Sequence, residues 1–492
     1  MSNIPPIGRA LEIVGSHSED LLLRRMTTRE KLGRLFRFQL EVLSERDDLP
    51  LEEFIGKDLT IRLELPSGRS GEYRYFHGYI SRIAHAGTLG RYALYQITLR
   101  PWLWFLTRTA DCRIFQGKTV PQILTDVFND SHRFRPDRIE ELDAVAYQPR
   151  EYCVQYAETD FDFVSRLMEH EGIYYYFRHE CEDDQGSHTL VLSDSIAGHE
   201  SRSGYEIVPY RPGPEEDDEV VTEWLVSQEF EPVRYVLRDY DFTNPAGKAA
   251  VDALEAVQGV ADTYMIYDYP GAFTEREDGE RYARVRLEEI EAKREQIRAR
   301  TTSLGLSAGQ LFGLEEHPRA DQNREYLIVS SVHDVGPIDY ESGGDAPLEF
   351  SSRFTAIGSA QTYRSPRRTP KPVMGGPQTA VVVGLPSQNR IYTDEYARIK
   401  VRFHWDRWRE HPDGKPIEDH DRSCWIRVAQ TKAGKGFGTL NLPYVGHEVI
   451  VDFLEGDPDR PVVLGSLYNE ANLPPLRRRE ASERSRARPN QG

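Results

Sequence analysis

The chain has 492 residues, which at the usual domain size suggests about three domains. Hydrophobic residues make up 39% and aromatic residues 11%, enough to bury a core, so a largely disordered chain is not expected. Asp and Glu number 80 against 62 Lys and Arg, and the net charge of −18 argues against nucleic acid as a partner, because phosphate binding draws on positive surfaces.

Cysteines and apolar runs exclude two further classes. Cys112, Cys153, Cys181 and Cys424 lie far apart and form no C-x-x-C pair, which argues against a disulfide framework or a cysteine zinc site. The sequence contains no run of about 18 apolar residues, so no membrane-spanning helix is predicted. The N-terminus lacks a basic segment followed by an apolar run, so we expect no signal peptide and assembly in the cytoplasm.

The first part of the chain predicts strands and then two helices. Residues 59–65 and 92–99 alternate apolar and polar side chains with period two, as in strands. Residues 120–128 place their apolar side chains on one helical face, with Thr119 as the N-cap. A second helix is predicted over 160–170.

Gly172 should stop that second helix. The run 173–177 (IYYYF) that follows is strongly β-prone. Residues 215–219 are all acidic and are interpreted as a solvated loop. Residues 276–300 predict a long helix on the surface, because a narrow apolar stripe runs along a heavily charged body; the stripe is Ala283, Leu287, Ile290 and Ile297.

Three prolines within residues 365–372 predict a stiff linker and a domain boundary near residue 370. Beyond it the pattern changes to short strands, at 397–405, 424–428, 449–453 and 462–464. About five strands in so short a segment favour a small barrel of the OB type. The last stretch, 477–492, carries six arginines and predicts a disordered tail: Arg477, Arg478, Arg479, Arg484, Arg486 and Arg488.

One motif is compatible with hydrolytic chemistry. Gly305–Gly309 matches the G-x-S-x-G nucleophile elbow, with Ser307 as the candidate nucleophile. That elbow needs a strand before it and a helix after it. Here a charged segment predicted to be helical comes before it, and a strand is predicted after it. We favour a loop, and a hydrolase using Ser307 remains a minor alternative.

Two further patterns are weaker. Gly117-Lys118-Thr119 resembles the end of a phosphate loop but lacks the earlier glycine, since position 112 is cysteine, so a turn and a helix cap are favoured. His170 and His179 flank the Tyr-rich strand, but no helical pair of ligands fixes a metal geometry.

Lys400, Arg402 and His404 form a basic stripe on a predicted OB strand, near Trp405 and Trp408, as in oligonucleotide-binding OB folds. Trp405, however, belongs to the apolar face of that strand, and 406–421 is acidic, so pairing of the stripe with acidic residues is favoured. The residues therefore predict no catalytic, cofactor or metal site and no nucleic-acid partner.

Nine distinctive runs are spread along the chain: 98–104 (TLRPWLW), 150–156 (REYCVQY), 160–167 (DFDFVSRL), 171–177 (EGIYYYF), 376–380 (GPQTA), 392–396 (YTDEY), 403–407 (FHWDR), 424–430 (CWIRVAQ) and 448–461 (EVIVDFLEGDPDRP). Together these runs resemble the VgrG family, the spike proteins of the bacterial type VI secretion system. The resemblance covers nearly the whole chain, from about residue 11 to residue 475.

The resemblance implies a mainly β fold with some helices (α+β), assembled as a trimer. Residues 1–370 correspond to a phage baseplate hub-like region of two β-barrel subdomains with helical insertions. Residues 371–475 correspond to the OB-fold spike domain, and 476–492 form the Arg-rich tail.

In this family a homotrimer contacts baseplate components and caps a tube of Hcp hexamers. A contracting sheath drives it into a target cell, so the protein is secreted by the type VI machinery. Effector or adaptor proteins travel on the spike or on a PAAR tip protein. In most members a long β-helix follows the OB fold, whereas here the resemblance ends at residue 475. This argues against direct PAAR binding and against an enzymatic C-terminal domain.

Two hypotheses about assembly follow from the residues themselves. Strand 449–454 carries Val449, Val451 and Phe453 on one face and Ile450 and Leu454 on the other, so its outer face calls for burial against another subunit. The Arg-rich tail is either solvated or an electrostatic handle through which the chain carries an effector or adaptor.

Overall fold

The computed structural model describes residues 11–15, 18–66, 73–130, 138–142, 147–214, 218–245, 250–254, 263–337, 348–385, 390–406 and 423–475. The predicted tail at 477–492, Trp408 and most of the acidic run at 215–219 lie outside these ranges. The chain forms two compact units. The large unit comprises 1–108, 124–147 and 164–369, and the small unit comprises 109–123, 148–163 and 370–492.

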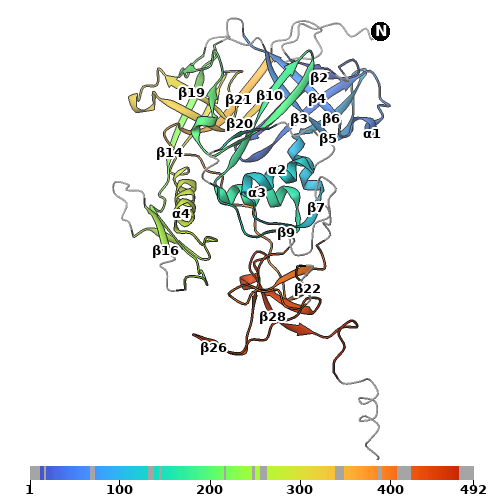
Figure 1. Cartoon of the computed structure of the whole chain (residues 1–492). Coiled ribbons are helices and arrows are strands. Elements are labelled where there is room, and N and C mark those ends of the chain that lie inside the picture. The colour runs from blue at the N-terminus through green and yellow to red at the C-terminus, as the bar shows by residue number, and fades with distance from the viewer. Residues whose placement is uncertain are drawn as a thin grey trace, which may run out of the picture. The chain divides into compact units, whose positions relative to one another are not determined.

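A single antiparallel path of strands organises the large unit (Figure 1). Its order is β1 (Leu11–Val14), β4 (Asp58–Glu64), β5 (Tyr73–Leu89), β6 (Tyr92–Arg100), β3 (Arg34–Ser44), β2 (Leu22–Lys31), β20 (Glu325–Pro337), β21 (Leu348–Gly358), β18 (Glu295–Thr301) and β14 (Val221–Gln228). The strands predicted at 59–65 and 92–99 are β4 and β6, so both predictions are confirmed. Pairing of β2 with β20 joins the two halves of the sheet, from Met26↔Val335 to Lys31↔Ser330.

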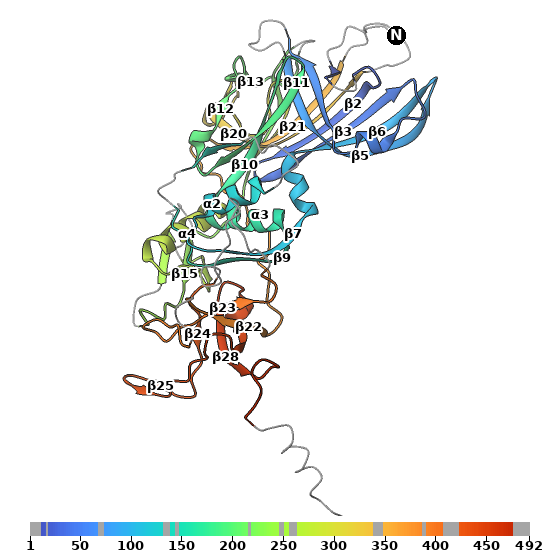
Figure 2. The ribbon, with the colours of Figure 1, turned by 45° about the vertical axis from the view of Figure 1, so that its right-hand side comes forward.

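Each half of this sheet buries its own core because alternate side chains point inward. In the first half, visible as β2, β3, β5 and β6 in Figure 2, Phe36 stacks on Phe38 with ring centroids 4.4 Å apart. In the second half, β19 (Gln310–Glu315) pairs with β20 and with two short strands, β12 (Glu200–Ser201) and β13 (Ile207–Pro209). Phe312 of β19 is fully buried there against Tyr326.

The helices and the Tyr-rich strand lie where the sequence predicts them. Helix α2 covers Val120–Asn129 and α3 covers Asp160–Glu171, while β10 (Tyr174–Glu182) pairs with β11 (Gln185–Ser193), and β11 with β8 (Arg138–Glu141). Thr119 caps α2 in a reciprocal box: its Oγ1 accepts the Gln122 N–H at 3.4 Å, and Gln122 Oε1 accepts the Thr119 N–H at 2.9 Å. Gly172 ends α3 with φ +82°, where a Cβ would meet Val285 at 2.7 Å.

The predicted long surface helix is wrong in its length and in its exposure. Helix α4 ends at Glu291 (Arg276–Glu291), and the following residues form strand β18, in which Ile297 is fully buried. Charged residues alternate with buried Ile297, Ala299 and Thr301 in β18, and this period-two pattern is hard to separate from a charged helix.

The apolar stripe of α4 faces a core, and the charged side of the helix is largely covered too, since Arg286 is buried. Ala283, Leu287 and Ile290 belong to one core cluster with residues of a small sheet in which β15 (Arg234–Arg238) lies between β16 (Ala250–Leu254) and β17 (Met265–Asp268). The large unit also holds a short helix, α1 (Leu51–Phe54). None of the described helices is long and apolar enough to cross a membrane.

Five short strands of the small unit close into a barrel, as the OB prediction requires. The order is β23 (Lys400–Phe403), β22 (Gln378–Val383), β27 (Glu448–Phe453), β28 (Pro461–Leu467) and β24 (Arg427–Val428). A bridge between Ile399 and Ile426 closes the ring from β24 back to β23. The unit also contains the pair β7 (Ala110–Phe115) and β9 (Cys153–Thr159), which a division at residue 370 leaves out, and the hairpin β25 (Ala433–Gly434) and β26 (Phe437–Gly438).

Three buried histidines hold β5, β10 and β11 together in the large unit. His188 Nε2 accepts the Trp102 N–H at 3.0 Å, so its Nδ1 carries the proton and donates to His77 Nδ1 at 2.7 Å. His179 Nδ1 accepts the backbone N–H of His77 at 3.2 Å. Burial lowers the pKa of His77 although Asp58 opposes it, and burial with the neighbouring histidines puts the pKa of His188 well below its usual range.

This cluster predicts loss of stability in mild acid. The folded-state pKa values lie below the ordinary 6.5, so the unfolded chain takes up protons first. Stability is therefore full above about pH 6.5 and falls by up to about 1.4 kcal/mol per pH unit for each histidine as the pH drops. Urea unfolding of the chain between pH 7.5 and about 5 measures this.

The matched variants are His188→Gln and His85→Gln. His188→Gln should lower stability at pH 7.5 and flatten the pH dependence, whereas substitution of the exposed His85 should leave the slope as in the unsubstituted chain. Equal slopes in all three proteins would contradict the prediction.

Candidate functional site

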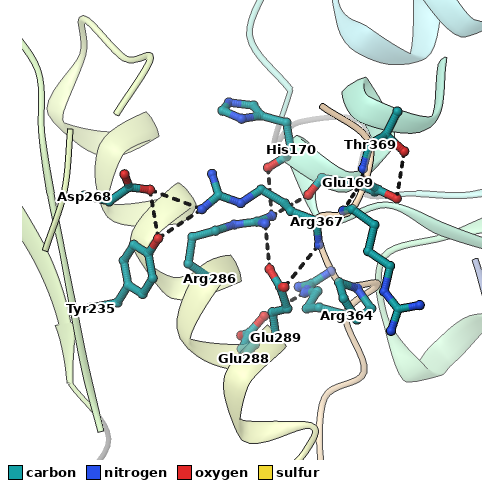
Figure 3. A network of polar contacts seen from close by, with 12 residues as sticks. Glu169, His170, Tyr235, Asp268, Arg286, Glu288, Glu289, Arg364, Arg367 and Thr369 are labelled. Atoms are coloured by element: carbon teal, nitrogen blue, oxygen red, sulfur yellow. Dashed lines mark hydrogen bonds and ion pairs between the residues drawn. The ribbon is translucent and has the colours of Figure 1, made fainter. Parts of the chain in front are cut away.

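The first half of the predicted linker is fixed to the large unit through a buried carboxylate (Figure 3). Glu169, on α3, has a side chain that is only 4% exposed. Its Oε2 accepts the backbone N–H groups of Arg368 at 2.8 Å and Thr369 at 2.9 Å, and its Oε1 accepts from Arg34 Nη1 at 3.0 Å. One carboxylate thus binds the linker backbone and an arginine together.

Arg364, which directly precedes the linker, and Arg367 within it contact other elements of the same unit. Arg364 Nε donates to Glu288 Oε2 at 2.7 Å, and its Nη1 donates to the carbonyl groups of Gly172 at 2.9 Å and Asp194 at 2.6 Å. Arg367 Nη2 donates to the Tyr235 hydroxyl at 3.0 Å and to Asp268 Oδ2 at 3.1 Å. The linker is therefore held to α3, α4, β15 and β17 at once.

Arg286 of α4 completes this network, which we call the linker clasp (Arg34, Glu169, Arg286, Glu288, Glu289, Arg364 and Arg367). Its side chain is 3% exposed and donates to Glu289 Oε2 at 2.7 Å and to the backbone carbonyls of Glu169 and His170. Burial and the neighbouring Arg367 lower the pKa of Arg286 to about 10, so it stays charged near neutral pH. Glu289 Oε1 also accepts the Arg367 N–H at 3.1 Å.

The other half of the linker is fixed inside the small unit. Lys371 Nζ lies 2.5 Å from Asp457 Oδ1 and 2.6 Å from Asp459 Oδ2. Burial acts to lower the pKa of Lys371, but the two carboxylates outweigh it and raise the pKa. The N–H of Met374 donates to the Gly456 carbonyl at 2.8 Å, and the Met374 side chain is buried in the barrel core.

Ser307 lies in a loop that leads into a strand, as favoured from the sequence. The element before it is strand β18, not the predicted helix, and β19 follows instead of a helix. The two glycines of the motif are explained by packing. A Cβ at Gly305 would lie 2.3 Å from the Tyr205 ring, and Gly309 has φ +90° beside Tyr176. The spacing therefore reflects close contacts rather than a strained elbow.

Ser307 does share a cavity of about 220 Å³ with His179 and Glu30. His179 Nδ1 accepts the His77 N–H, so its proton sits on Nε2, which lies 3.5 Å from Glu30 Oε1. In this tautomer neither ring nitrogen is available to take the Ser307 proton, and a Ser–His pair of the hydrolase kind is not formed.

The remaining candidates form no site. Gly117 is a turn glycine with φ +59° before the α2 cap, as favoured. The His170 ring packs on Tyr282 with centroids 4.5 Å apart, whereas His179 packs among Phe36, Phe38 and His188, so the two histidines do not come together. Within the described ranges no three His, Cys, Asp or Glu side chains are grouped to hold a metal ion.

Two residues of the basic stripe, Lys400 and His404, contact other side chains of the same unit. The Lys400 ammonium lies 5.3 Å from the centroid of the Trp425 ring, and His404 Nε2 is 3.1 Å from Thr379 Oγ1. Trp405 stacks on Phe403 with centroids 5.0 Å apart and donates its Nε1–H to Gln378 Oε1 at 2.9 Å. Trp405 thus packs against the core, as predicted, rather than standing ready to stack on a base.

Comparison with known families agrees with the two units. The model of the phage tail baseplate hub (GPD) matches residues 29–337, and that of the type VI secretion system/phage-baseplate injector OB domain matches residues 393–468. These matches cover most of the large sheet and most of the closed barrel. The fold is thus that of a phage-tail-like hub followed in the sequence by an OB domain.

Individual proteins similar to this chain are spike proteins of the type VI secretion system or bear the VgrG name. The chain is 47% identical to the type VI secretion system spike protein VgrG1a of Pseudomonas aeruginosa, covering 92% of this chain and 68% of that protein. It is 46% identical to VgrG1c of the same organism, covering 93% and 61%. It is 31% identical to the actin cross-linking toxin VgrG1 of Vibrio cholerae, covering 95% and 42%. The chain therefore spans between two fifths and about two thirds of the length of these relatives.

A solved structure has the same fold. The E. coli c3393 protein, a type VI secretion component similar to the T4 bacteriophage tail proteins gp27 and gp5, superposes with a TM-score of 0.63 at 21% identity, covering 93% of this chain and 99% of that one. The chain is a phage-tail-like spike component. It belongs to the VgrG family of type VI secretion system spike proteins.

The clasp predicts that Glu169→Gln loosens the linker. The substitution keeps the size of the side chain but removes the buried negative charge that pairs with partly exposed Arg34 and accepts the linker N–H groups, and a hydrogen bond to a charged group is typically worth about 1.5–3 kcal/mol. We expect faster cleavage by trypsin after Arg367 and Arg368 in the native protein, followed by mass spectrometry of the fragments.

Glu180→Gln is the matched control, because Glu180 is exposed on β10. It should leave the cleavage rate unchanged. If Glu169→Gln is cut no faster than Glu180→Gln, the carboxylate does not hold the linker.

Proposed function

We propose that this chain is a structural, non-enzymatic spike that works as a homotrimer. Residues 1–370 act as the hub that meets baseplate components and caps the tube of Hcp hexamers, and residues 371–475 act as the OB spike domain. Sheath contraction drives the assembly through the envelope of a target cell, with effector or adaptor proteins attached. Family membership supports this proposal, and so do the clasp and the closed barrel.

The observation that carries the proposal is the anchoring of the linker on both sides of Pro370. Residues up to Thr369 are bound in the large unit, and Lys371 is bound in the small unit. One residue of slack cannot take up much displacement, since a residue spans at most about 3.6 Å. The chain thus has no long free segment at the boundary between the units, which supports a spike built from two structured parts in direct succession.

The barrel surface supports self-association. Val449, Val451 and Phe453 of β27 are buried in the barrel core, as the alternation predicts. Ile450 is only partly covered, and Leu454 and Leu464 are 39% and 48% exposed. Burying apolar side chains of this size contributes roughly 1.5–3 kcal/mol each. A contact repeated around a threefold axis closes into a ring.

The chain is thus predicted to be a trimer at micromolar concentration. Light scattering on the purified chain should give about three times the mass of one chain. Ile450→Arg should shift it towards monomer, because a charge in the covered face is costly. Glu395→Arg, at an exposed position outside β27 and β28, should leave the trimer intact.

The same preparations test the hub role. Added to Hcp tubes, the trimer should appear in electron micrographs at tube ends, and the Ile450→Arg chain should not. A monomeric unsubstituted chain would contradict the trimer, and attachment along the sides of tubes would contradict the cap.

The proposal also predicts that Ser307→Ala changes no hydrolytic activity. His179 cannot accept the Ser307 proton in the tautomer that its hydrogen bond with the His77 N–H requires, so it is not a base for this serine. Release of nitrophenol from a generic ester should be equal for the Ser307→Ala chain, for Ser331→Ala and for the unsubstituted chain. A hydrolysis rate lost only in Ser307→Ala would establish an enzyme instead.

A further inference from the structure

The cavity that contains Ser307 has the composition of a binding site. It measures about 220 Å³ and lies among β5, β10, β12 and the loop before β19. Its polar lining includes three arginines and one buried carboxylate, together with a histidine and the serine: Arg74, Arg178, Arg202, Glu30, His179 and Ser307.

Three buried atoms of this lining have no hydrogen-bond partner among the described residues. They are Glu30 Oε2, His179 Nε2 and Arg202 Nε. The side chains of Glu30 and His179 are only 9% and 8% exposed, and their closest approach of 3.5 Å is too long for a good hydrogen bond. Leaving such groups unsatisfied is costly, so the cavity calls for an occupant with complementary groups.

The charges of the cavity do not cancel. Arg74 Nη2 lies 3.6 Å from Glu30 Oε2. Burial tends to lower the pKa of Arg178, but Tyr176, Glu200 and Glu141 raise it, so this arginine also has carboxylates nearby. Arg202 donates its Nη2–H to the Tyr73 carbonyl at 2.8 Å and has no carboxylate within ion-pair distance among the described residues. The residues that line the cavity include these three arginines and two carboxylates, Glu30 and Glu200, so one positive charge is left over.

We propose that this cavity binds a phosphate group that retains a proton. The Nε2–H of His179 and the Nε–H of Arg202 donate to two phosphate oxygens, and the arginine charge is neutralised. The protonated oxygen donates to Glu30 Oε2, the acceptor among the three unsatisfied atoms. Each of the three unsatisfied atoms then has a partner of the right kind.

The buried carboxylate makes the site selective. Phosphate near neutral pH carries at least one proton and can donate to Glu30. Sulfate has the same shape but carries no proton at that pH, so its oxygens would face the carboxylate and be repelled. A hydrogen bond between charged groups is worth about ten-fold or more in affinity, and this sets the expected preference for phosphate.

Calorimetric titration of the full chain with inorganic phosphate and with sulfate, in low-salt buffer at pH 7, tests the proposal. Phosphate should bind at least about ten-fold more tightly than sulfate. Glu30→Gln should abolish the preference by admitting sulfate, and Arg202→Gln should weaken both anions. Arg319→Gln, at an exposed surface pair, should change neither.

A second set of titrations distinguishes free phosphate from a phosphate ester as the ligand. A phosphate monoester such as glycerol phosphate should compete if the cavity mouth admits an esterified group, whereas binding of free phosphate alone would assign the site to the inorganic ion. Circular dichroism verifies that each variant is folded. If Arg202→Gln fails to fold, Arg202→Lys keeps the charge, loses the Nε–H donor and should still bind more weakly.

Two results would overturn the proposal. One is equal affinity for phosphate and sulfate in the unsubstituted chain, which would indicate a general salt effect. The other is unchanged phosphate affinity in Arg202→Gln together with an unchanged preference for phosphate in Glu30→Gln, which would place the anion elsewhere.

Discussion

The carboxylate of Glu169 is the constraint on which the path of the chain between its two units depends. A carboxylate this deeply buried is unfavourable unless charged and backbone donors surround it. Arg34 supplies one donor, and the linker supplies its own N–H groups at Arg368 and Thr369. Moving the linker away would leave the buried Oε2 atom without its two backbone donors, so the position of the linker follows from the cost of leaving a buried acceptor unsatisfied.

In the small unit an ion pair also fixes the linker, but there the linker carries the charged side chain and that charge is positive. There the linker contributes the cation, Lys371, and the barrel contributes two carboxylates, Asp457 and Asp459. Each unit thus holds its own end of the linker by electrostatics as well as packing, with Met374 entering the barrel core next. Hydrophobic contact alone would tolerate sliding by a residue, whereas ion pairs with backbone hydrogen bonds fix the register.

The sequence predicted those helices and strands that depend on interactions between residues close together in the chain. Helices α2 and α3 and strands β4 and β6 were predicted because apolar spacing, Thr119 as a cap and Gly172 as a stop act within a few residues. Two features needed contacts distant in sequence. The end of α4 at Glu291 depends on the pairing of β18 with β14 and β21, and the role of Glu169 depends on residues some two hundred positions later. Charge complementarity indicates that such pairs exist but not which ones form.

The cavity shows how one backbone hydrogen bond decides between two chemistries. The sequence pattern around Ser307 suggested a nucleophile, and the fold does bring a histidine and a carboxylate to the same cavity. The N–H of His77 occupies His179 Nδ1, and this fixes the proton on Nε2. A histidine fixed in that way cannot serve as the base for Ser307, but its Nε2–H is a buried donor with no acceptor among the described residues. The same bond therefore removes the argument for hydrolysis and supplies one of the two N–H groups that an oxyanion would need.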